Sequence, residues 1–387
     1  MTQGRSMDTR VERFTPERVA AVQAFNRRLT AAGAHWRFPE DPVPSWLPRT
    51  EHIPVFQEYF LLTQGEHVRG GYVLRRQEAS FRGTMMPVGS PYWLLSEGTI
   101  DRAYAPVARQ LLADAMRREP MLFTVGLEGE DTPIARLLRA LGWQLGVAPF
   151  LFKVLNGSRF LREVRYLRST RLREWLLDLA AVSGAGRAGA RLLDLTLTRR
   201  PGRGRGVAAE VVDEFHGWTD EVWRSCAKKY SFVGARHSRV LNHVFPRGKP
   251  GLVRVKVTAR GEPVGYAVVR DVQTPGHEHF GGMRVGIILD CLADPEDAHA
   301  VIWSAAEVLQ HRGVDLVFSN QTHPAWCSAL RRAGFLPGPS RFVFARSRPL
   351  SEILAREDPT TRAVHVNRGD GDFPWGSTLR MRAQAWD

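Results

Sequence analysis

The chain has 387 residues, 43% of them hydrophobic and 24% charged, which is typical of a soluble globular protein and sufficient for two domains. No apolar run approaches the roughly 20 residues of a membrane-spanning helix, and the polar N-terminus lacks the apolar core of a signal peptide. The three cysteines lack metal-ligand spacing, so we expect a protein of the reducing cytoplasm with no bound metal.

The net charge of +14 suggests a polyanionic partner, but the pattern of basic residues supports this only in part. Only five of the 54 basic residues are lysine, and the chain has no zinc knuckle, basic tail or aromatic RNA-binding signature. Arginines crowd two stretches of one central segment, namely Arg159, Arg162, Arg165, Arg168, Arg171 and Arg173, and then Arg199, Arg200, Arg203 and Arg205. We favour a solvated or interdomain surface there over a phosphate- or membrane-binding one.

Apolar spacing and turn residues predict a helix and then strands at the start of the chain. Thr15-Pro16-Glu17 has the N-cap, first-turn proline and acidic residue of a helix start, and this helix ends near Gly33. The elements predicted after it are strands 58–64, 68–77 and 92–96, helix 101–118, strand 121–127, helix 132–141 and strand 147–155.

A central segment separates these elements from a second, similar series. Residues 161–181 and 185–198 are predicted to be helical, and Pro201 to Gly206 a flexible joint. The first helix could brace two domains, which we favour, or make peripheral contact with a membrane. The elements predicted beyond it are strands 252–258, 263–272 and 284–292, helix 295–311, strand 314–319, helix 324–333 and strand 340–345.

The last polar stretch, residues 364–372, lies outside both series. Its density of Asn, Asp, Arg and Gly is typical of a structured loop rather than of disorder. It is expected either to fold back over a site as a lid or to form a surface turn.

The two series are copies of each other. Leu-Leu-Arg-Ala-Leu-Gly-Trp ending at Trp143 returns as Ala-Leu-Arg-Arg-Ala-Gly-Phe ending at Phe335. Gly142 and Gly334 are 192 residues apart (334 minus 142), and so are Phe152 and Phe344. A period this long indicates a duplicated domain rather than a solenoid.

In both copies the order of elements, ending in a helix, a glycine turn and an aromatic strand, resembles the GNAT acyltransferase fold. Two such units in tandem are similar to double-GNAT proteins, including FemAB-like aminoacyl transferases and tandem acyl-CoA N-acyltransferases. The resemblance implies an α/β (α+β) fold of two tandem GNAT-like domains, each a mixed, mostly antiparallel sheet flanked by helices. The implied divisions are 11–155 and 207–348 for the domains, 156–206 for an Arg-rich helical linker and 349–387 for a C-terminal tail.

The family's acyl-CoA motif, Gln/Arg-x-x-Gly-x-Gly/Ala, opens the helix after the central strand, where backbone N–H groups face the pyrophosphate. Arg102 fits its first position, but Ala105 and Val107 replace the glycines, and three carboxylates occupy 294–297 in the second copy. Acyl-CoA is still the expected donor, with aminoacyl-tRNA second. The residues expected to contact the donor are Arg102, Cys291 and Leu292.

In that fold the reacting groups lie where the central strand and the next strand diverge, and the second copy is the more polar there. Asn320 matches a family position that helps to order donor or water. His323 is a candidate general acid or base, since an ordinary histidine has a pKa near ~6.5, or it simply lies exposed at a helix start. Asp290 could accept the proton of an amine, or form an ion pair with Arg284 or Arg270.

The resemblance also implies an acceptor site in the helical start of the second copy. The expected acceptor-binding residues are Trp218, Tyr230, Arg236 and Arg284. The first copy offers only Glu97 or Glu128 as a base, so the second copy is expected to be catalytic and the first a scaffold or acceptor-binding unit.

The sequence therefore predicts an N-acyltransferase that moves an acyl or aminoacyl group to an amine of a small molecule, sugar or peptide. The acceptor amine would attack the donor carbonyl directly, while backbone N–H groups hold the oxyanion. The alternatives are a FemAB-like transferase that uses aminoacyl-tRNA, and a catalytically silent GNAT-fold protein that binds a ligand or partner.

Overall fold

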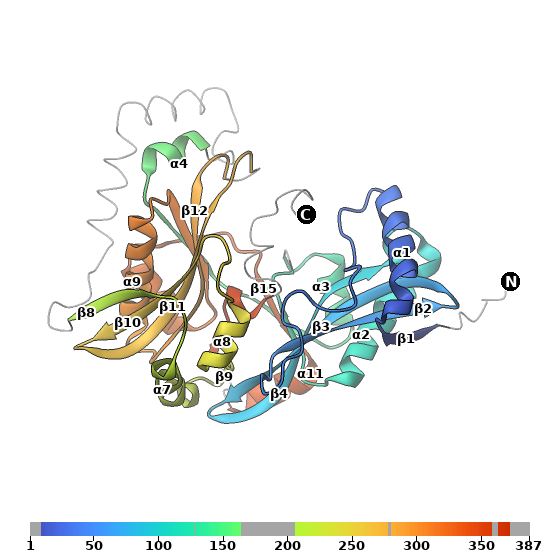
Figure 1. Cartoon of the computed structure of the whole chain (residues 1–387), viewed down its shortest axis with the longest axis horizontal. Helices are drawn as coiled ribbons and strands as arrows, with labels where there is room; N and C mark the ends of the chain where they lie inside the picture. The colour runs from blue at the N-terminus through green and yellow to red at the C-terminus, as the bar shows by residue number, and fades with distance from the viewer. Residues whose placement is uncertain (1–8, 128, 164–205, 278–279, 358–362, 372–387) are drawn as a thin grey trace.

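The computed structural model describes residues 9–127, 129–163, 206–277, 280–357 and 363–371. Figure 1 shows most of the N-terminal half, blue to teal, on the right and most of the C-terminal half, yellow to red, on the left, while the green helix α4 (Gly157–Glu163) lies on the left and α11 (Arg348–Glu357) lies near α2. Both halves are α/β layers built on mixed, mostly antiparallel sheets, as the sequence predicts. No helix within the described ranges is long and apolar enough to cross a membrane.

The N-terminal half places helices on both faces of one sheet. Strand β3 pairs antiparallel with β2 and with β4, and its side chains alternate between the faces. On one face Val73 packs with helix α1, and on the other Tyr72 and Leu74 pack with helix α2. The elements are β1 (Arg10–Arg13), α1 (Val19–Ala31), β2 (Phe56–Gln64), β3 (His67–Phe81), β4 (Thr84–Ser96), α2 (Pro106–Arg118), β5 (Phe123–Val125), α3 (Pro133–Ala140), β6 (Gln144–Val147), β7 (Phe150–Val154) and α4 (Gly157–Glu163).

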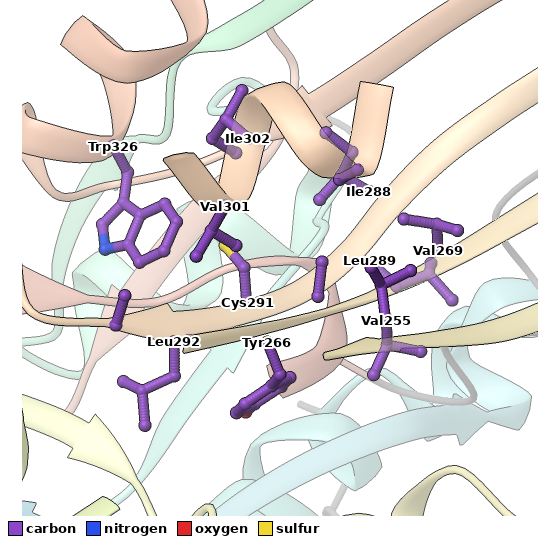
Figure 2. Packing of buried hydrophobic residues seen from close by; sticks show 14 of the residues in the cluster. Val255, Tyr266, Val269, Ile288, Leu289, Cys291, Leu292, Val301, Ile302 and Trp326 are labelled. Carbon is purple, nitrogen blue, oxygen red and sulfur yellow. The ribbon is translucent and has the colours of Figure 1, made fainter. Parts of the chain in front are cut away.

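The C-terminal half repeats this arrangement around a larger apolar core. In Figure 2 Val301 of α9 lies beside Cys291 of β12, while Leu292 points to the opposite face with Tyr266. The elements are β8 (Val207–Val212), α7 (Gly217–Cys226), β9 (Phe232–Gly234), α8 (Ser238–Val244), β10 (Leu252–Ala259), β11 (Glu262–Gln273), β12 (Arg284–Ala293), α9 (Ala298–His311), β13 (Leu316–Asn320), α10 (Pro324–Arg332), β14 (Leu336–Gly338), β15 (Val343–Arg346), α11 (Arg348–Glu357) and β16 (Val364–His365).

The two halves exchange their last strands. Strand β7, from the N-terminal half, pairs between β13 and β14 of the C-terminal sheet. Its repeat counterpart β15, from the C-terminal half, pairs between β5 and β6 of the N-terminal half. Neither of the two domains that end at 155 and 348 in the sequence division is therefore complete by itself, because each takes its last strand from the other half.

Two further strands of the C-terminal half extend the N-terminal sheet. Strand β9 pairs with the end of β3, and β16 pairs in parallel with β9. An apolar cluster joins the halves at this point, with Phe123 of β5, Phe232 of β9 and Phe344 of β15 in mutual ring contact. The halves thus share backbone pairing and a core.

Two sequence predictions fail locally. Residues 147–155 are not one strand, because the chain breaks at Ala148-Pro149, where it leaves one sheet and enters another as β7. Of the two alternatives left open for the polar stretch from 364, the surface turn is wrong, since Val364, Val366 and Asn367 are buried. The predicted helices and joint of the central segment lie, from 164 to 205, outside the described residues.

The exchange predicts that the protein unfolds as one unit and that Phe344→Ala weakens both halves. Removing the ring leaves a cavity against Phe123 and Phe232, so we expect a loss of about 3–5 kcal/mol in the free energy of unfolding. Urea titration followed by far-UV circular dichroism and tryptophan fluorescence should give one transition, shifted equally for both signals.

The control variant is Val211→Ala, because Val211 is 59% exposed and its loss should cost less than about 0.5 kcal/mol. Two separate transitions, of which Phe344→Ala shifts only one, would contradict this interlocked core.

Candidate functional site

The strand ends predicted to carry the chemistry diverge in the second half. Strands β12 and β13 pair in parallel only from Val285 to Ile287, opposite Leu316 to Phe318. Just beyond, β12 carries a bulge at Leu289, where the register with β11 shifts. Bulges re-aim side chains next to functional sites, and this one turns the strand before Asp290.

The chain itself fills the space between these strand ends. The C-terminal segment, defined here as residues 363–371, is held by Thr322, whose amide donates to the carbonyl of Val366 over 3.1 Å and whose hydroxyl donates to the carbonyl of Val364 over 2.7 Å. On the β12 side, Nε2 of His365 lies 2.8 Å from the carbonyl oxygen of Cys291. The C-terminal segment therefore bridges β12 and the turn after β13.

A buried charge cluster fixes the same segment. The Arg236 guanidinium donates to Asp290 over 3.1 Å and to Asp370 over 2.7 Å, and Nδ2 of Asn367 donates to Asp290 over 2.7 Å. Arg75, from β3 of the other half, donates to the carbonyl of Gly371 over 3.1 Å. Although burial alone would lower the pKa of Arg236, the carboxylates of Asp290 and Asp370 raise it well above its ordinary value, so this guanidinium stays charged. Burial raises the pKa of Asp290, and Arg236 beside it acts in the opposite direction.

Beside this cluster four rings pack together. His365 stacks on Tyr230 at 4.9 Å and on Trp326 at 5.2 Å between centroids, and His323 meets Tyr230 edge-on at 5.1 Å. The Tyr230 hydroxyl accepts from Nε1 of Trp326 and donates to the carbonyl of Ala293. Burial holds the pKa of His365 well below its usual value, so this ring is neutral.

Asn320 is also fully occupied. This buried side chain donates through Nδ2 to the carbonyl of Pro149 over 3.2 Å, where the chain crosses between the halves, and accepts through Oδ1 from Nε of Arg368 over 2.9 Å. His323 accepts from the amide of Ala325 and thereby caps α10. These contacts position neighbouring segments, and the catalytic roles predicted for Asn320, His323 and Asp290 stay predictions.

The structure brings together five of the residues singled out in the sequence, namely Tyr230, Arg236, Asp290, Asn320 and His323. Asp290 pairs with Arg236, and the predicted pairing with Arg284 or Arg270 is wrong, since Arg284 binds Asp271 at the other end of β12.

The remaining candidates lie apart or are buried. Trp218, on α7, packs against Phe215, which precedes that helix. Arg102 is exposed in a short turn before α2. Leu292 is fully buried in the apolar core. Burial raises the pKa of the Cys291 thiol well above its usual value, which fits an apolar core residue rather than a nucleophile.

Sequence reasoning missed Arg75 and the individual roles of His365, Asn367, Arg368 and Asp370. Their only sequence signal was the polar density of 364–372, which has no counterpart in the first copy. Arg75 lies in a strand pattern and gave no signal.

The first half diverges in the same way, but no segment among the described residues is hydrogen-bonded across it as residues 363–371 are in the second half. Strand β4 makes one isolated parallel bridge, from Gly89 to Leu122, the residue before β5. Strand β4 then carries a bulge at Trp93 and Leu94, with Trp93 at φ 49°. Leu94 and Leu95 remain half-buried, whereas every residue of β12 from Val285 onward is buried. The strand facing the gap is thus more accessible in the first half.

The first half has two candidate bases, Glu97 and Glu128. Glu97 is 3% exposed and ion-pairs with Arg28 and with Arg69, at 2.8 Å from the latter, so each of its carboxylate oxygens holds an arginine donor. Glu128 lies outside the described residues. Within the described ranges, no three His, Cys, Asp or Glu side chains converge to hold a metal ion.

The arrangement of strands and helices is similar to that of solved N-acyltransferase structures. No model of a known protein family and no curated protein matches the sequence. A solved structure of a GCN5-related N-acetyltransferase from Anabaena variabilis matches with a TM-score of 0.52 and 11% identity, over 88% of this chain and 72% of that one. The fold is that of a GCN5-related N-acetyltransferase.

Two other solved structures match with lower TM-scores. One is Saccharomyces cerevisiae N-myristoyltransferase with bound myristoyl-CoA, at 11% identity and a TM-score of 0.47 over 88% of this chain and 78% of that one. The other is a probable N-acyltransferase from Enterococcus faecalis, at 11% identity and a TM-score of 0.48 over 88% and 73%. The FemAB-like relationship finds no support among them.

The buried histidine predicts a pH dependence of stability. The pKa of His365 is depressed in the folded state, so the unfolded chain binds a proton more readily below about pH 6.5. The contribution of His365 to the free energy of unfolding should therefore be constant above that pH and fall as the pH is lowered from 6.5 to 5, by at most about 1.4 kcal/mol per pH unit.

The matched variant is His365→Phe, which keeps the stacking on Tyr230 and Trp326 but cannot be protonated. Urea titrations of both proteins between pH 5 and 8 should show a flatter profile for the variant. Parallel profiles would contradict a buried, neutral His365.

Proposed function

We propose that the protein is an acyltransferase that moves an acyl group from a thioester donor, such as acyl-CoA, to the amine of a small molecule, sugar or peptide. The observation that carries this proposal is the divergence of β4 from β5 beyond a single bridge, with a bulge on the strand that borders the gap. A diverging strand edge offers backbone N–H and C=O groups to an extended amide-containing ligand, as an added strand would. The shared fold with an N-acetyltransferase supports the same reaction class.

The donor is proposed to enter the first half, in place of the second half favoured by the sequence. In the second half the C-terminal segment already lies between β12 and the turn after β13, through His365, Thr322 and Asn367. A donor there would have to expel a segment whose charge cluster is buried. The half-buried Leu94 and Leu95 of β4 face no comparable obstacle among the described strands.

The reaction needs little covalent participation from the protein. The neutral acceptor amine attacks the thioester carbonyl, a C–N bond forms, the C–S bond breaks, and the proton lost by the nitrogen passes to the leaving thiolate to give a thiol. Backbone N–H groups at the bulge of β4 would stabilise the oxyanion that develops on the carbonyl oxygen. In this scheme Asp290, Asn320 and His323 position the C-terminal segment.

A specific observation favours a second candidate, a catalytically silent protein that binds a ligand. The loop after β4 has no glycine-rich phosphate cradle, and its Glu97 is an acidic group tied to Arg28 and Arg69. Aminoacyl-tRNA is a further alternative donor, because a FemAB-like transferase that uses it does not need a glycine-rich phosphate loop.

The experiment incubates the full-length protein with acyl-CoA of two to sixteen carbons and a mixture of primary amines, and follows thiol release. Native mass spectrometry of the same samples reports donor binding. We expect binding and thiol release that depends on the amine. Binding without release would favour the silent protein, and the absence of binding at millimolar donor would overturn the proposal.

The choice of half is tested with an acyl-CoA that carries a photoreactive diazirine in its acyl chain. After irradiation and digestion, we expect labelled peptides from 89–96 and 122–127, because β4 is accessible there. Labels confined to 287–293 and 317–322 would assign the donor to the second half instead. Excess unlabelled acyl-CoA should remove specific labels and serves as the control.

A further inference from the structure

Arg368, on the C-terminal segment, is a guanidinium that has no acidic partner in the part of the chain that the structure describes. It stacks over the ring of Phe318 at 4.8 Å and over that of Phe342 at 5.2 Å from the centroids. Its Nε donates to Oδ1 of Asn320 over 2.9 Å. Among the described residues, no carboxylate lies within ion-pairing distance of it, so both Nη groups are left for another acceptor.

Of the two arginines buried near it, Arg236 is compensated, because it lies between the carboxylates of Asp290 and Asp370. Arg75 donates to backbone carbonyls, and burial lowers its pKa although Asp370 raises it in part. Burial likewise lowers the pKa of Arg368 to about 10, and none of the described carboxylates raises it again. A desolvated cation is unfavourable unless an anion accompanies it, so Arg368 is suited to an anion from outside the chain.

The position of Arg368 places this cation where the two halves meet. Asn320, which holds it, is the last residue of β13. Phe342, on which it stacks, approaches the backbone at Gly126, directly after β5, with a ring carbon 3.7 Å from where a Cβ would stand. Arg368 itself keeps part of its surface exposed. A group bound by Arg368 would therefore lie at the carboxyl ends of β13 and β5 together.

We propose that Arg368 binds an oxyanion of a substrate, either a carboxylate or a phosphate, through its two Nη groups. The two phenylalanine rings and Asn320 fix the plane of the guanidinium, and a planar fork of this kind suits two-point contact with a carboxylate or phosphate. The inference rests on the proposed function in one respect, since it makes this oxyanion part of the acceptor or of the donor. The binding itself does not require turnover.

The test measures binding of small probes to the full-length protein by isothermal titration calorimetry. The probes are inorganic phosphate, N-acetylglycine with N-acetylglycinamide, and coenzyme A with pantetheine. We expect the wild-type protein to bind at least one oxyanion probe at least tenfold more tightly than Arg368→Gln does, and to prefer it to its uncharged counterpart. Binding of N-acetylglycine indicates a carboxylate source, and binding of coenzyme A alone indicates a phosphate source.

The matched control is Arg346→Gln. Arg346 also stacks on a phenylalanine, Phe344 at 5.5 Å, also bonds a side-chain amide, that of Gln144, and likewise lacks an acidic partner among the described residues. It lies at the far end of β15, so its loss should leave probe binding unchanged. Equal binding by wild type and Arg368→Gln, or equal loss in both variants, overturns the proposal.

A second measurement needs no variant, in case Arg368→Gln fails to fold. Phenylglyoxal modifies accessible arginines, and peptide mapping by mass spectrometry reads each site separately. The best-bound probe should slow modification of Arg368 at least tenfold and that of Arg346 not at all. Unchanged modification of Arg368 overturns the proposal, whereas protection of Arg368 in a protein without acyl transfer would overturn only the proposed function.

Discussion

The structure depends on the exchange of β7 and β15 between its halves. Each of these strands is central rather than peripheral in the sheet that receives it, with a neighbour on both sides. An exposed strand edge invites pairing, and each half without its borrowed strand would present two such edges. The apolar cluster of Phe123, Phe232 and Phe344 forms only when the exchange is complete. The relative position of the halves, and with it the meeting of their strand ends, follows from this pairing.

The sequence predicts most of the fold because its signals are local. Apolar periodicity and capping residues place α1, α9, α10 and the long strands, and the repeat identifies β7 and β15 as equivalent. Nothing in the repeat says which half receives which strand, because both strands have the same alternating aromatic pattern. Only the break at Ala148-Pro149 marks the crossing, and a two-residue break inside an apolar stretch resembles an ordinary bulge.

The candidate site was predictable in its residues but not in their partners. Separate sequence signals indicate five residues that the structure brings together, namely Asn320, His323, Asp290, Arg236 and Tyr230. Their sequence interpretation assumed an open gap between β12 and β13. The C-terminal segment occupies it instead, held by charges whose pairing spans more than a hundred residues of chain in the case of Arg236 and Asp370. Long-range ion pairs leave no periodic trace, so no pattern in 364–372 could assign those residues to that gap.

The exchange of β7 and β15 is reciprocal, like that of a domain-swapped dimer, and is contained in one polypeptide. A single-copy ancestor would have completed its sheet with the last strand of a second molecule, and gene fusion would make that partnership permanent. Fusion also allows the two copies to acquire different substitutions, whereas a substitution in a symmetric dimer changes both sites at once. The C-terminal segment is such a departure from symmetry: it closes one of two equivalent gaps and carries Arg368 to the boundary of the other half.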